Sequence, residues 1–205
     1  ISNPALSIKT HEQHCNPTNN TKNQFGEPMN AALKTALENK QSRANADNIV
    51  KLFQNNAFSL EELFLAIEMC EEPYSQRAAW PMGIILAEQP QSGLPFIYRM
   101  FKLLDKKNHP SVRRLIMGYF AIIQIPEDLE GPLYDKCFAW VTDLSLPATI
   151  PIFSMQIMYN IGLKYPELHD ELYLIIKDLM PFAKGGVYSR SKKIKHWIEV
   201  SRRPF

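Results

Sequence analysis

The chain has 205 residues, enough for one domain with a sizeable core, and its 45% hydrophobic and 21% charged content is ordinary for a globular protein. Its 23 basic and 21 acidic residues leave a net charge of +2, a balance that does not demand a nucleic acid or an anionic membrane as partner. No run of about 18 apolar residues occurs, so no membrane-spanning helix is expected. The lack of a secretory signal pattern and the wide spacing of Cys15, Cys70 and Cys137 favour the cytoplasm.

Residues 1–28 differ in composition from the rest of the chain. They are rich in Asn, Thr, Pro and Gln and show no hydrophobic periodicity, so we expect a disordered or appended tail. Within this tail, "HEQHC" at 11–15 contains His and Cys, which are transition-metal ligands. A structural zinc site needs four ligands, and no second pair lies nearby in the sequence. We therefore predict no metal site and no cofactor.

The remainder, 29–205, is predicted to be a single domain of helical hairpins. Two short helices are expected at 30–39 and 43–56, which together form an N-terminal cap, 29–56. Four longer units, each with a helix, a turn and a second helix, are expected at 59–88, 94–124, 131–163 and 166–202. No segment alternates with a period of two residues, so no β-sheet is expected.

The longer units repeat every 37 residues. Pro73, Pro110 and Pro147 are separated by this interval, and the same register aligns three apolar columns. The columns are Leu60, Ile97 and Tyr134; Phe64, Phe101 and Phe138; and Ile67, Leu104 and Val141, with a one-residue slip in the last unit at Leu172, Ile176 and Leu179. Because the columns are spaced as on one face of a helix, we predict that their residues occupy equivalent places in stacked hairpins.

Several helix boundaries carry local signals. Ser59 and Glu62 have the spacing of a capping box, in which each side chain accepts a hydrogen bond from an unpaired amide. The three repeated prolines fit the opening turn of the second helix of each unit, where a missing N–H costs nothing. Pro81 falls inside such a helix and is expected to kink it.

Stacked hairpins of this kind define an all-α fold, a right-handed α-α superhelix of four to five hairpins. One hairpin cannot bury its apolar face alone, so its neighbours must cover that face and the end units must be polar outside. The second helix of each unit is expected to line the concave face of this solenoid.

The stretch "LLDKKNHPSVRRLIMGYFAII" resembles a HEAT repeat, in which an acidic residue ends the outer helix and Val-Arg opens the inner one. More narrowly, the span 59–202, with "YSQRAAW", "CFAWVTD", "FSMQIMYNIG" and "YSRSKKIKHWIEV", is similar to a family of short bacterial HEAT-like proteins of undetermined function. The resemblance implies a helical-repeat fold and a pair between Arg113 and Asp105. Its motifs concern the fold and imply no catalytic residue.

Members of that family often carry an adenylosuccinate lyase name. Fumarase-type lyases are much longer chains with a flexible Ser-containing loop, and no loop of the "SSxMPxKxN" kind is present here. The sequence also lacks a Gly-rich phosphate loop, a nucleophile elbow and paired carboxylates beside a His. The prediction therefore leans toward a protein that is not an enzyme, without lyase activity.

The leading hypothesis is a binding module whose concave face holds a protein or peptide partner, because solenoids present extended surfaces. The candidate binding residues are polar or basic positions on the inner helices, namely Arg77, Arg114, Gln156, Arg190 and Lys193. No membrane partner is expected.

The alternative is a DNA-binding or DNA-repair protein resembling the HEAT-like alkylpurine DNA glycosylases, which use a concave basic surface with tryptophans and an acidic residue. Trp80 and Trp140 lie in apolar stripes and are expected in the core, whereas Trp197 lies among basic residues. The basic segment 189–203 either contacts phosphates or caps the end of the solenoid. No Trp-Asp arrangement of the glycosylase kind is found.

Overall fold

The computed structural model describes residues 29–201, and this part of the chain contains ten α-helices, one 3-10 helix (η1) and no strand. The helices are α1 (Ala31–Glu38), α2 (Arg43–Gln54), α3 (Leu60–Glu68), α4 (Tyr74–Glu88), η1 (Pro90–Phe96), α5 (Ile97–Leu103), α6 (Pro110–Phe120), α7 (Glu127–Val141), α8 (Thr149–Gly162), α9 (Glu167–Leu179) and α10 (Gly185–Ser201). They fall where the sequence pattern predicts helices.

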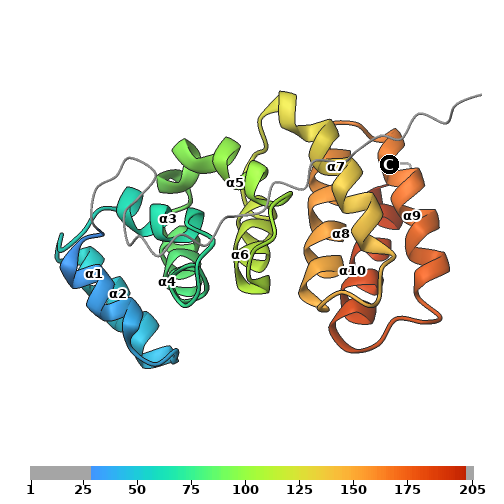
Figure 1. Ribbon diagram of the computed structural model, residues 1–205. Coiled ribbons are helices and arrows are strands. Elements are labelled where there is room, and N and C mark those ends of the chain that lie inside the picture. The colour runs from blue at the N-terminus through green and yellow to red at the C-terminus, as the bar shows by residue number, and fades with distance from the viewer. Residues whose placement is uncertain (1–28, 202–205) are drawn as a thin grey trace, which may run out of the picture.

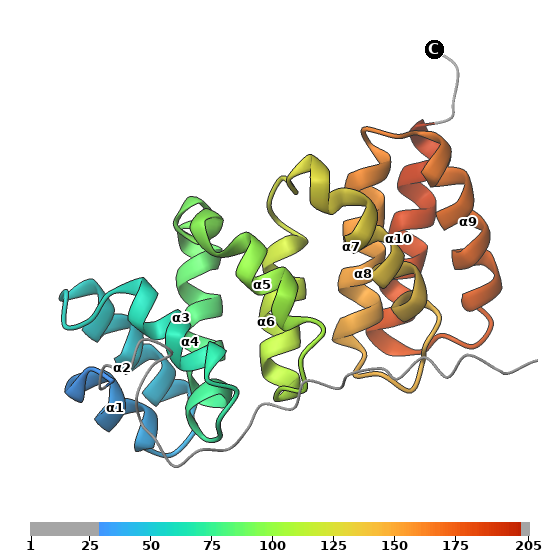
Figure 2. The ribbon, with the colours of Figure 1, turned by 45° about the horizontal axis from the view of Figure 1, so that its top comes forward.

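Successive helices fold back on one another, and the hairpins lie side by side in the order of the sequence (Figures 1 and 2). Helices α2, α4, α6, α8 and α10 each pack against the next member of this series. We call these five helices the inner row. Of the remaining helices, α3 packs on α4, α7 on α8, and α9 on both α8 and α10. The described part of the chain is therefore the predicted helical solenoid.

Polar contacts between hairpins connect only neighbours. Within the described residues, most side-chain hydrogen bonds between different helices join residues 26 to 40 positions apart, which is about one repeat, and two shorter ones span 9 and 10 positions. Arg99 on α5, for example, donates from Nε to Glu68 Oε1 (3.0 Å) and from Nη1 to Glu61 Oε1 (2.7 Å), both on α3. Asn160 at the end of α8 donates from Nδ2 to the carbonyl of Ala121 after α6 (3.0 Å). Each unit is thus held by the units beside it, as expected for a stack.

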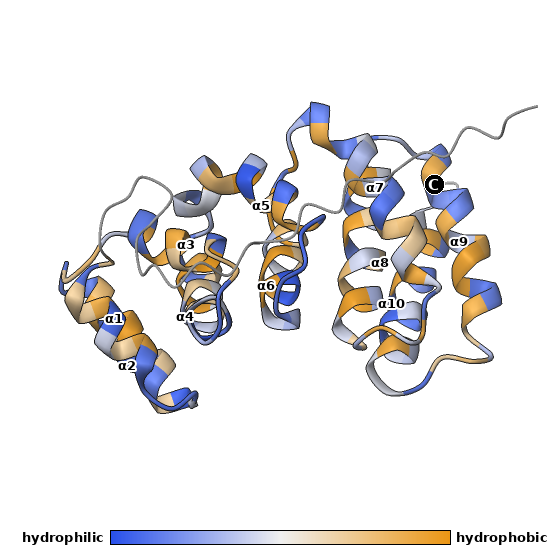
Figure 3. Cartoon of the chain, in the orientation of Figure 1, coloured by the Kyte–Doolittle hydropathy of each residue, from blue (hydrophilic) through white to orange (hydrophobic). Residues whose placement is uncertain are grey.

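The core follows the predicted apolar columns in most places. Each helix carries both apolar and polar residues (Figure 3). The buried apolar side chains of all the helices form one core cluster. Ile67, Leu104 and Val141 are all buried, as are Ile97 and Tyr134, while Leu60 is half-buried. The slipped positions of the last unit, Leu172, Ile176 and Leu179, are buried as well. These columns confirm the register of the repeat.

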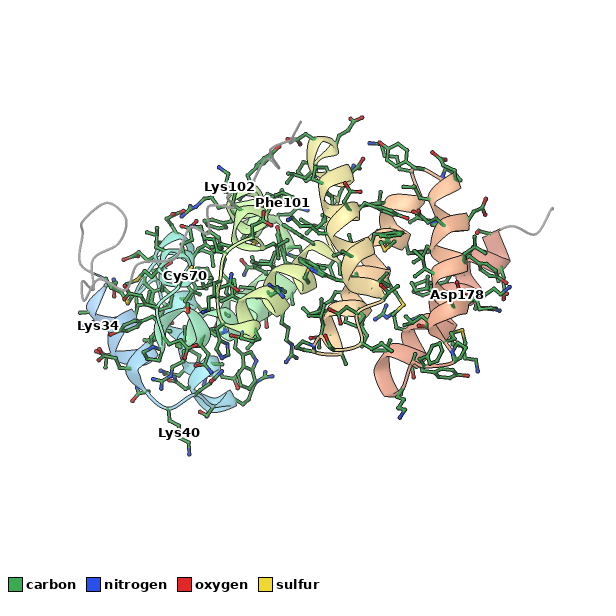
Figure 4. The ribbon with its side chains drawn as sticks, turned by 45° about the vertical axis from the view of Figure 1, so that its right-hand side comes forward. Lys34, Lys40, Cys70, Phe101, Lys102 and Asp178 are labelled. Carbon is green, nitrogen blue, oxygen red and sulfur yellow. The ribbon has the colours of Figure 1, made fainter. Side chains whose placement is uncertain are left out.

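The column of phenylalanines departs from this register. Phe64 is buried and Phe101 on α5 (Figure 4) is half-buried, with Lys136 Nζ 5.5 Å from the centre of its ring, but Phe138 on α7 is 45% exposed. The prediction is therefore wrong for Phe138. The buried stripe of α7 passes through Cys137 instead, and the next residue along a helix lies about 100° around its axis, which turns Phe138 outward.

The predicted capping box is confirmed at the start of α3. The backbone N–H of Glu62 donates to Ser59 Oγ (3.1 Å), and the backbone N–H of Ser59 donates to Glu62 Oε2 (2.7 Å). Pro110 is the first residue of α6, while Pro73 immediately precedes α4 and Pro147 lies two residues before α8. Each repeated proline therefore lies at a helix start, between two residues before the helix and its first residue.

Two sequence predictions concern the ends of the chain and the membrane. The tail 1–28, with its "HEQHC" segment, lies outside the described residues. None of the helices between residues 29 and 201 is both long enough and apolar enough to cross a bilayer.

Candidate functional site

A groove of about 780 Å³ lies on the inner row, mainly between α4 and α6. We call it the inner groove. Its lining includes residues from the α1–α2 connection, from the start of α2, from both walls and from α8: Gln41, Arg43, Trp80, Gly83, Ile84, Ala87, Glu88, Ser111, Arg114, Leu115, Gly118, Tyr119, Ile122 and Phe153. A volume in this range is typical of pockets that enclose ligands of drug size or short peptide segments.

One wall of the inner groove is an apolar stripe of α4 that the neighbouring helices cover only in part. Trp80, Gly83, Ile84 and Ala87 have the i, i+3, i+4, i+7 spacing of one helical face, and each is exposed or half-buried. The opposite face of α4, which includes Ala79 and Met82, is buried in the core. Helix α4 is therefore apolar on two faces, one fully buried in the core and one only partly covered.

Trp80 was predicted to be a core residue, and this prediction is wrong, because its side chain is 41% exposed. The residue before it, Ala79, belongs to the buried stripe of α4, so Trp80 is turned about 100° away from the core and into the groove. Trp140 and Trp197, by contrast, are half-buried and pack against the core. Trp80 is thus the tryptophan that the described structure presents in the inner groove.

The second wall follows α6 from its first turn to the residues just after it. Ser111, Arg114, Leu115 and Gly118 lie on one face of α6, and Ile122 follows the helix with 55% of its side chain exposed. A Cβ placed on Gly118 would lie 3.4 Å from the ring of Phe153. The lack of a side chain at this glycine allows Phe153 of α8 to reach the groove.

The charges of the inner groove are unevenly placed. Arg114 is exposed, and no carboxylate of the described residues lies within ion-pair distance of it. Arg43 also lines this end of the groove and pairs with Asp47 on its own helix (Nε to Oδ1, 2.9 Å). Glu88, the last residue of α4, lies at the other end.

Arg77, a second predicted binding residue, contacts the first hairpin. Its Nη1 donates to the carbonyls of Leu37 (2.9 Å) and Glu38 (2.8 Å), the last residues of α1. Basic side chains commonly satisfy the unpaired carbonyls at a helix C-terminus. This contact assigns Arg77 a part in fixing α4 against α1.

The other predicted residues lie further along the inner row, away from Arg114. Arg190 of α10 donates from Nη1 to Gln156 Oε1 of α8 (2.5 Å), and Gln156 Nε2 donates to Asn160 Oδ1 (2.8 Å). Lys193 is exposed on α10, with its Nζ 4.7 Å from the centre of the Trp197 ring. The five predicted residues therefore do not form one cluster, and only Arg114 lines the inner groove.

The pair expected between Arg113 and Asp105 does not form. Asp105 instead forms an ion pair with Lys136 of the next unit, while the guanidinium of Arg113 lies 5.3 Å from the centre of the Trp140 ring. The prediction is wrong because both side chains find partners on α7, across the boundary between units.

A second cavity, of about 580 Å³, lies at the edge of the solenoid where the chain passes from α6 to α7. We call it the edge cavity. Leu94, Tyr98 and Ile122 are exposed apolar residues in its lining, and Glu127, Glu130 and Lys164 line it too. The Glu130 carboxylate is nearly buried and accepts hydrogen bonds from Lys164 Nζ (3.1 Å) and from Tyr165 Oη (3.0 Å).

Two titratable groups, one lining the edge cavity and one in the core, on α7, have shifted pKa values. Hydrogen bonds to Tyr165 and Glu130 raise the pKa of Lys164, which keeps it a cation. Burial raises the pKa of the Cys137 thiol to about 12, so this cysteine is protonated and unreactive at neutral pH. Within residues 29–201 no group of three or more His, Cys, Asp or Glu side chains is placed to hold a metal ion.

Some of the basic side chains of α10, the last helix of the described chain, are bound to other residues of the protein. Lys195 forms an ion pair with Glu199 (2.5 Å), and Arg190 is bound to Gln156. Lys192 and Lys193 are exposed on α10. This mixture of paired and solvated cations is compatible with the capping role that the sequence suggests.

The apolar stripe of α4 that lines the inner groove was not predicted from the sequence, although the sequence contains a signal for it. The segment "AAWPMGIILA" is apolar almost all around a helix, and Trp80, Ile84 and Ala87 trace a second stripe beside the buried one. Such a helix is expected either to be covered on two sides or to leave one apolar side for a partner.

The fold and the groove together define a helical-repeat protein with an uncovered inner face. A family model described as a HEAT repeat domain matches residues 33–198, which is most of the chain, and the chain belongs to this family. No curated protein and no solved structure matches the chain.

Proposed function

We propose that the protein is a binding module whose inner groove holds a segment of a protein partner. The observation that carries the proposal is the exposed apolar surface of the inner groove, where Trp80 of α4 is 41% exposed and Ile122, just after α6, is 55% exposed. Contiguous apolar surface rimmed by polar residues is typical of interaction sites, and Trp and Arg are the residues most often found at their centres.

The family supports the same conclusion, because stacked repeats present extended surfaces that suit elongated partners. In this proposal Arg114 is the main polar contact of the inner groove, and Gln156, Arg190 and Lys193 extend the surface along α8 and α10. Arg77 contributes by holding α4 in place. We propose that this module acts in the cytoplasm, as the sequence pattern suggests.

The proposal can be tested by filling the inner groove. A Cβ on Gly83 would make an ordinary contact with Leu115 Cδ1 at 3.5 Å, and Gly83 lines the groove, so the larger side chain of Gly83→Leu takes up space in the groove. Tagged wild-type protein and this variant are used to capture partners, which are identified by quantitative mass spectrometry. Ala139→Leu, at an exposed position of α7, is the matched control.

We expect one or more proteins to be captured by the wild type and by Ala139→Leu and to be depleted with Gly83→Leu. Partners captured equally by all three would contradict binding through the inner groove, provided that circular dichroism shows the same helix content in each.

Nucleic-acid binding is a second candidate, favoured by the exposed Lys192 and Lys193 of α10. Titration with short DNA duplexes at low and high salt separates the two candidates. Binding through phosphates is tight at low salt and falls steeply as salt rises. The absence of binding at low salt would eliminate this candidate.

A further inference from the structure

The inner groove and the edge cavity adjoin at Ile122, and we call the two hollows together the channel. Ile122 lines both of them. Tyr119, which lines the inner groove, donates a hydrogen bond from its hydroxyl to the carbonyl of Pro90 (2.7 Å), and Pro90 lines the edge cavity. The last residue of α4 in the inner groove, Glu88, lies two positions before Pro90. The two hollows are therefore neighbours, one on each side of Ile122.

The two ends of this channel carry opposite charge. At the end near the start of α6 the charged lining residues are Arg43 and Arg114, with Asp47 beside Arg43 as the neutralising group. The positive end of the α6 dipole adds to this field, since Ser111 and Arg114 lie in its first turns. This end of the channel is therefore positive.

The other end of the channel is negative. Glu88 lies where the two hollows meet, and Glu127 and Glu130 line the edge cavity beyond it. These three carboxylates face one lining cation, Lys164, which is already bound to Glu130 and lies 3.7 Å from Glu127. Glu127 remains largely exposed and accessible to a ligand.

Between the charged ends the lining is apolar. Trp80, Ile84 and Phe153 lie on the positive side of Ile122, and Leu94 and Tyr98 lie on the other side. Arg114 and Ile122 are eight positions apart along α6 and its end, which corresponds to about 12 Å of helix. An extended peptide crosses that distance in about four residues.

On the basis of the proposed function, we propose that the occupant is a short extended segment of a partner protein with a fixed order of side-chain chemistry. A carboxylate binds beside Arg114, two or more apolar side chains cover Trp80, Ile84 and Ile122, and a basic side chain lies near Glu88 and Glu127. A partner with this layout meets complementary charge at each end, which selects one orientation in the channel.

Selection from a phage-displayed library of random short peptides tests both the groove and the order of chemistry. The library is selected on the wild type and, in parallel, on the filled variant Gly83→Leu. We expect enriched sequences on the wild type with an acidic residue, an apolar centre and a basic residue, and none of these sequences on the filled variant.

The possible outcomes separate this inference from the proposed function. Enriched peptides that need an open groove but lack the charge order would overturn the inference and leave the binding function intact. No enrichment, or enrichment that ignores the filling of the groove, would contradict both. Enriched peptides with two acidic or two basic ends count against the charge order as well.

A charge exchange adds a measurement that does not depend on filling the groove. Arg114→Glu reverses one exposed charge, and we expect it to weaken a selected peptide about tenfold, equivalent to about 1.4 kcal/mol. Replacing the acidic residue of the peptide by Lys should restore most of this affinity. Lys102→Glu, an exposed charge reversal on α5, is the matched control. Failure of the exchange to restore binding would show that the carboxylate does not lie beside Arg114.

Discussion

The close contact between α8 and α9 allows a sharp prediction at Gly162. A Cβ added to this glycine would lie 2.3 Å from Cδ2 and 2.6 Å from Nε2 of His169. The His169 ring is only 7% exposed, its Nε2 lies 3.0 Å from the carbonyl oxygen of Tyr159, and it stacks on the Tyr159 ring at 4.9 Å between centroids. The substitution Gly162→Ala must therefore displace a side chain that is held on several sides.

Two effects of this substitution oppose each other. Alanine is favoured over glycine inside a helix by about 1 kcal/mol, and the gain is smaller here because Gly162 is the last residue of α8. Overpacking a core typically costs about 1–3 kcal/mol. If His169 moves instead, a hydrogen bond of about 1 kcal/mol and a ring contact of about 0.5–1.5 kcal/mol are lost. We expect a net loss of about 1–2 kcal/mol in the free energy of unfolding.

Urea unfolding followed by circular dichroism measures this change, with Gly83→Ala as the control. Gly83 lies within α4, and its added Cβ would make an ordinary contact of 3.5 Å, so this variant should gain up to about 1 kcal/mol. The two glycine-to-alanine changes therefore have opposite predicted signs. A Gly162→Ala protein as stable as the wild type would refute the packing described for α8 and α9.

Ser59→Ala should lower the free energy of unfolding by about 1 kcal/mol, because it removes the capping box of α3; an unchanged urea midpoint would argue against that cap. Phe64→Ala should lower the free energy of unfolding by about 3–5 kcal/mol, whereas Phe138→Ala, at an exposed position, should lower it by less than about 1 kcal/mol. Equal losses would show that Phe138 is buried like Phe64, as the repeat pattern alone predicts. In a variant whose sole cysteine is Cys137, the thiol should react with Ellman's reagent at pH 8 only after unfolding, since burial raises its pKa to about 12; rapid labelling of the native protein would contradict its burial.

The sequence was sufficient to predict the helices and their stacking. The interval of 37 residues and the columns such as Ile67, Leu104 and Val141 reflect one requirement, that each hairpin must bury its apolar face against the next. The cap at Ser59 could be predicted because it involves neighbouring residues only. Such features depend on spacing along the chain and are therefore visible in it.

The orientation of individual helices about their axes was harder to predict. Cys137 and Phe138 are adjacent apolar residues, and the pattern allows either to face the core. The same ambiguity applies to Ala79 and Trp80 on α4, where the whole helix is apolar. The neighbouring units decide between such alternatives by packing, and this information is spread over the whole fold.

The candidate site was only partly predictable for a related reason. Arg114 could be selected from its place in the repeat, and it does line the inner groove. The partners of Arg77 and Arg190 lie on α1 and α8, so their hydrogen bonds required the arrangement of the hairpins in space. Asp105 and Arg113 were likewise paired wrongly, because each contacts the following unit.

The exposure of Trp80 offers the most direct test of the central claim that the inner groove is a binding surface. In a variant with Trp140→Phe and Trp197→Phe, Trp80 is the remaining tryptophan, and acrylamide quenching of its fluorescence reports its accessibility. We predict that a peptide selected on the wild type protects Trp80, so that quenching falls several-fold at saturation. Unchanged quenching, while calorimetry shows that the same peptide is bound, would place the binding surface elsewhere and contradict the claim.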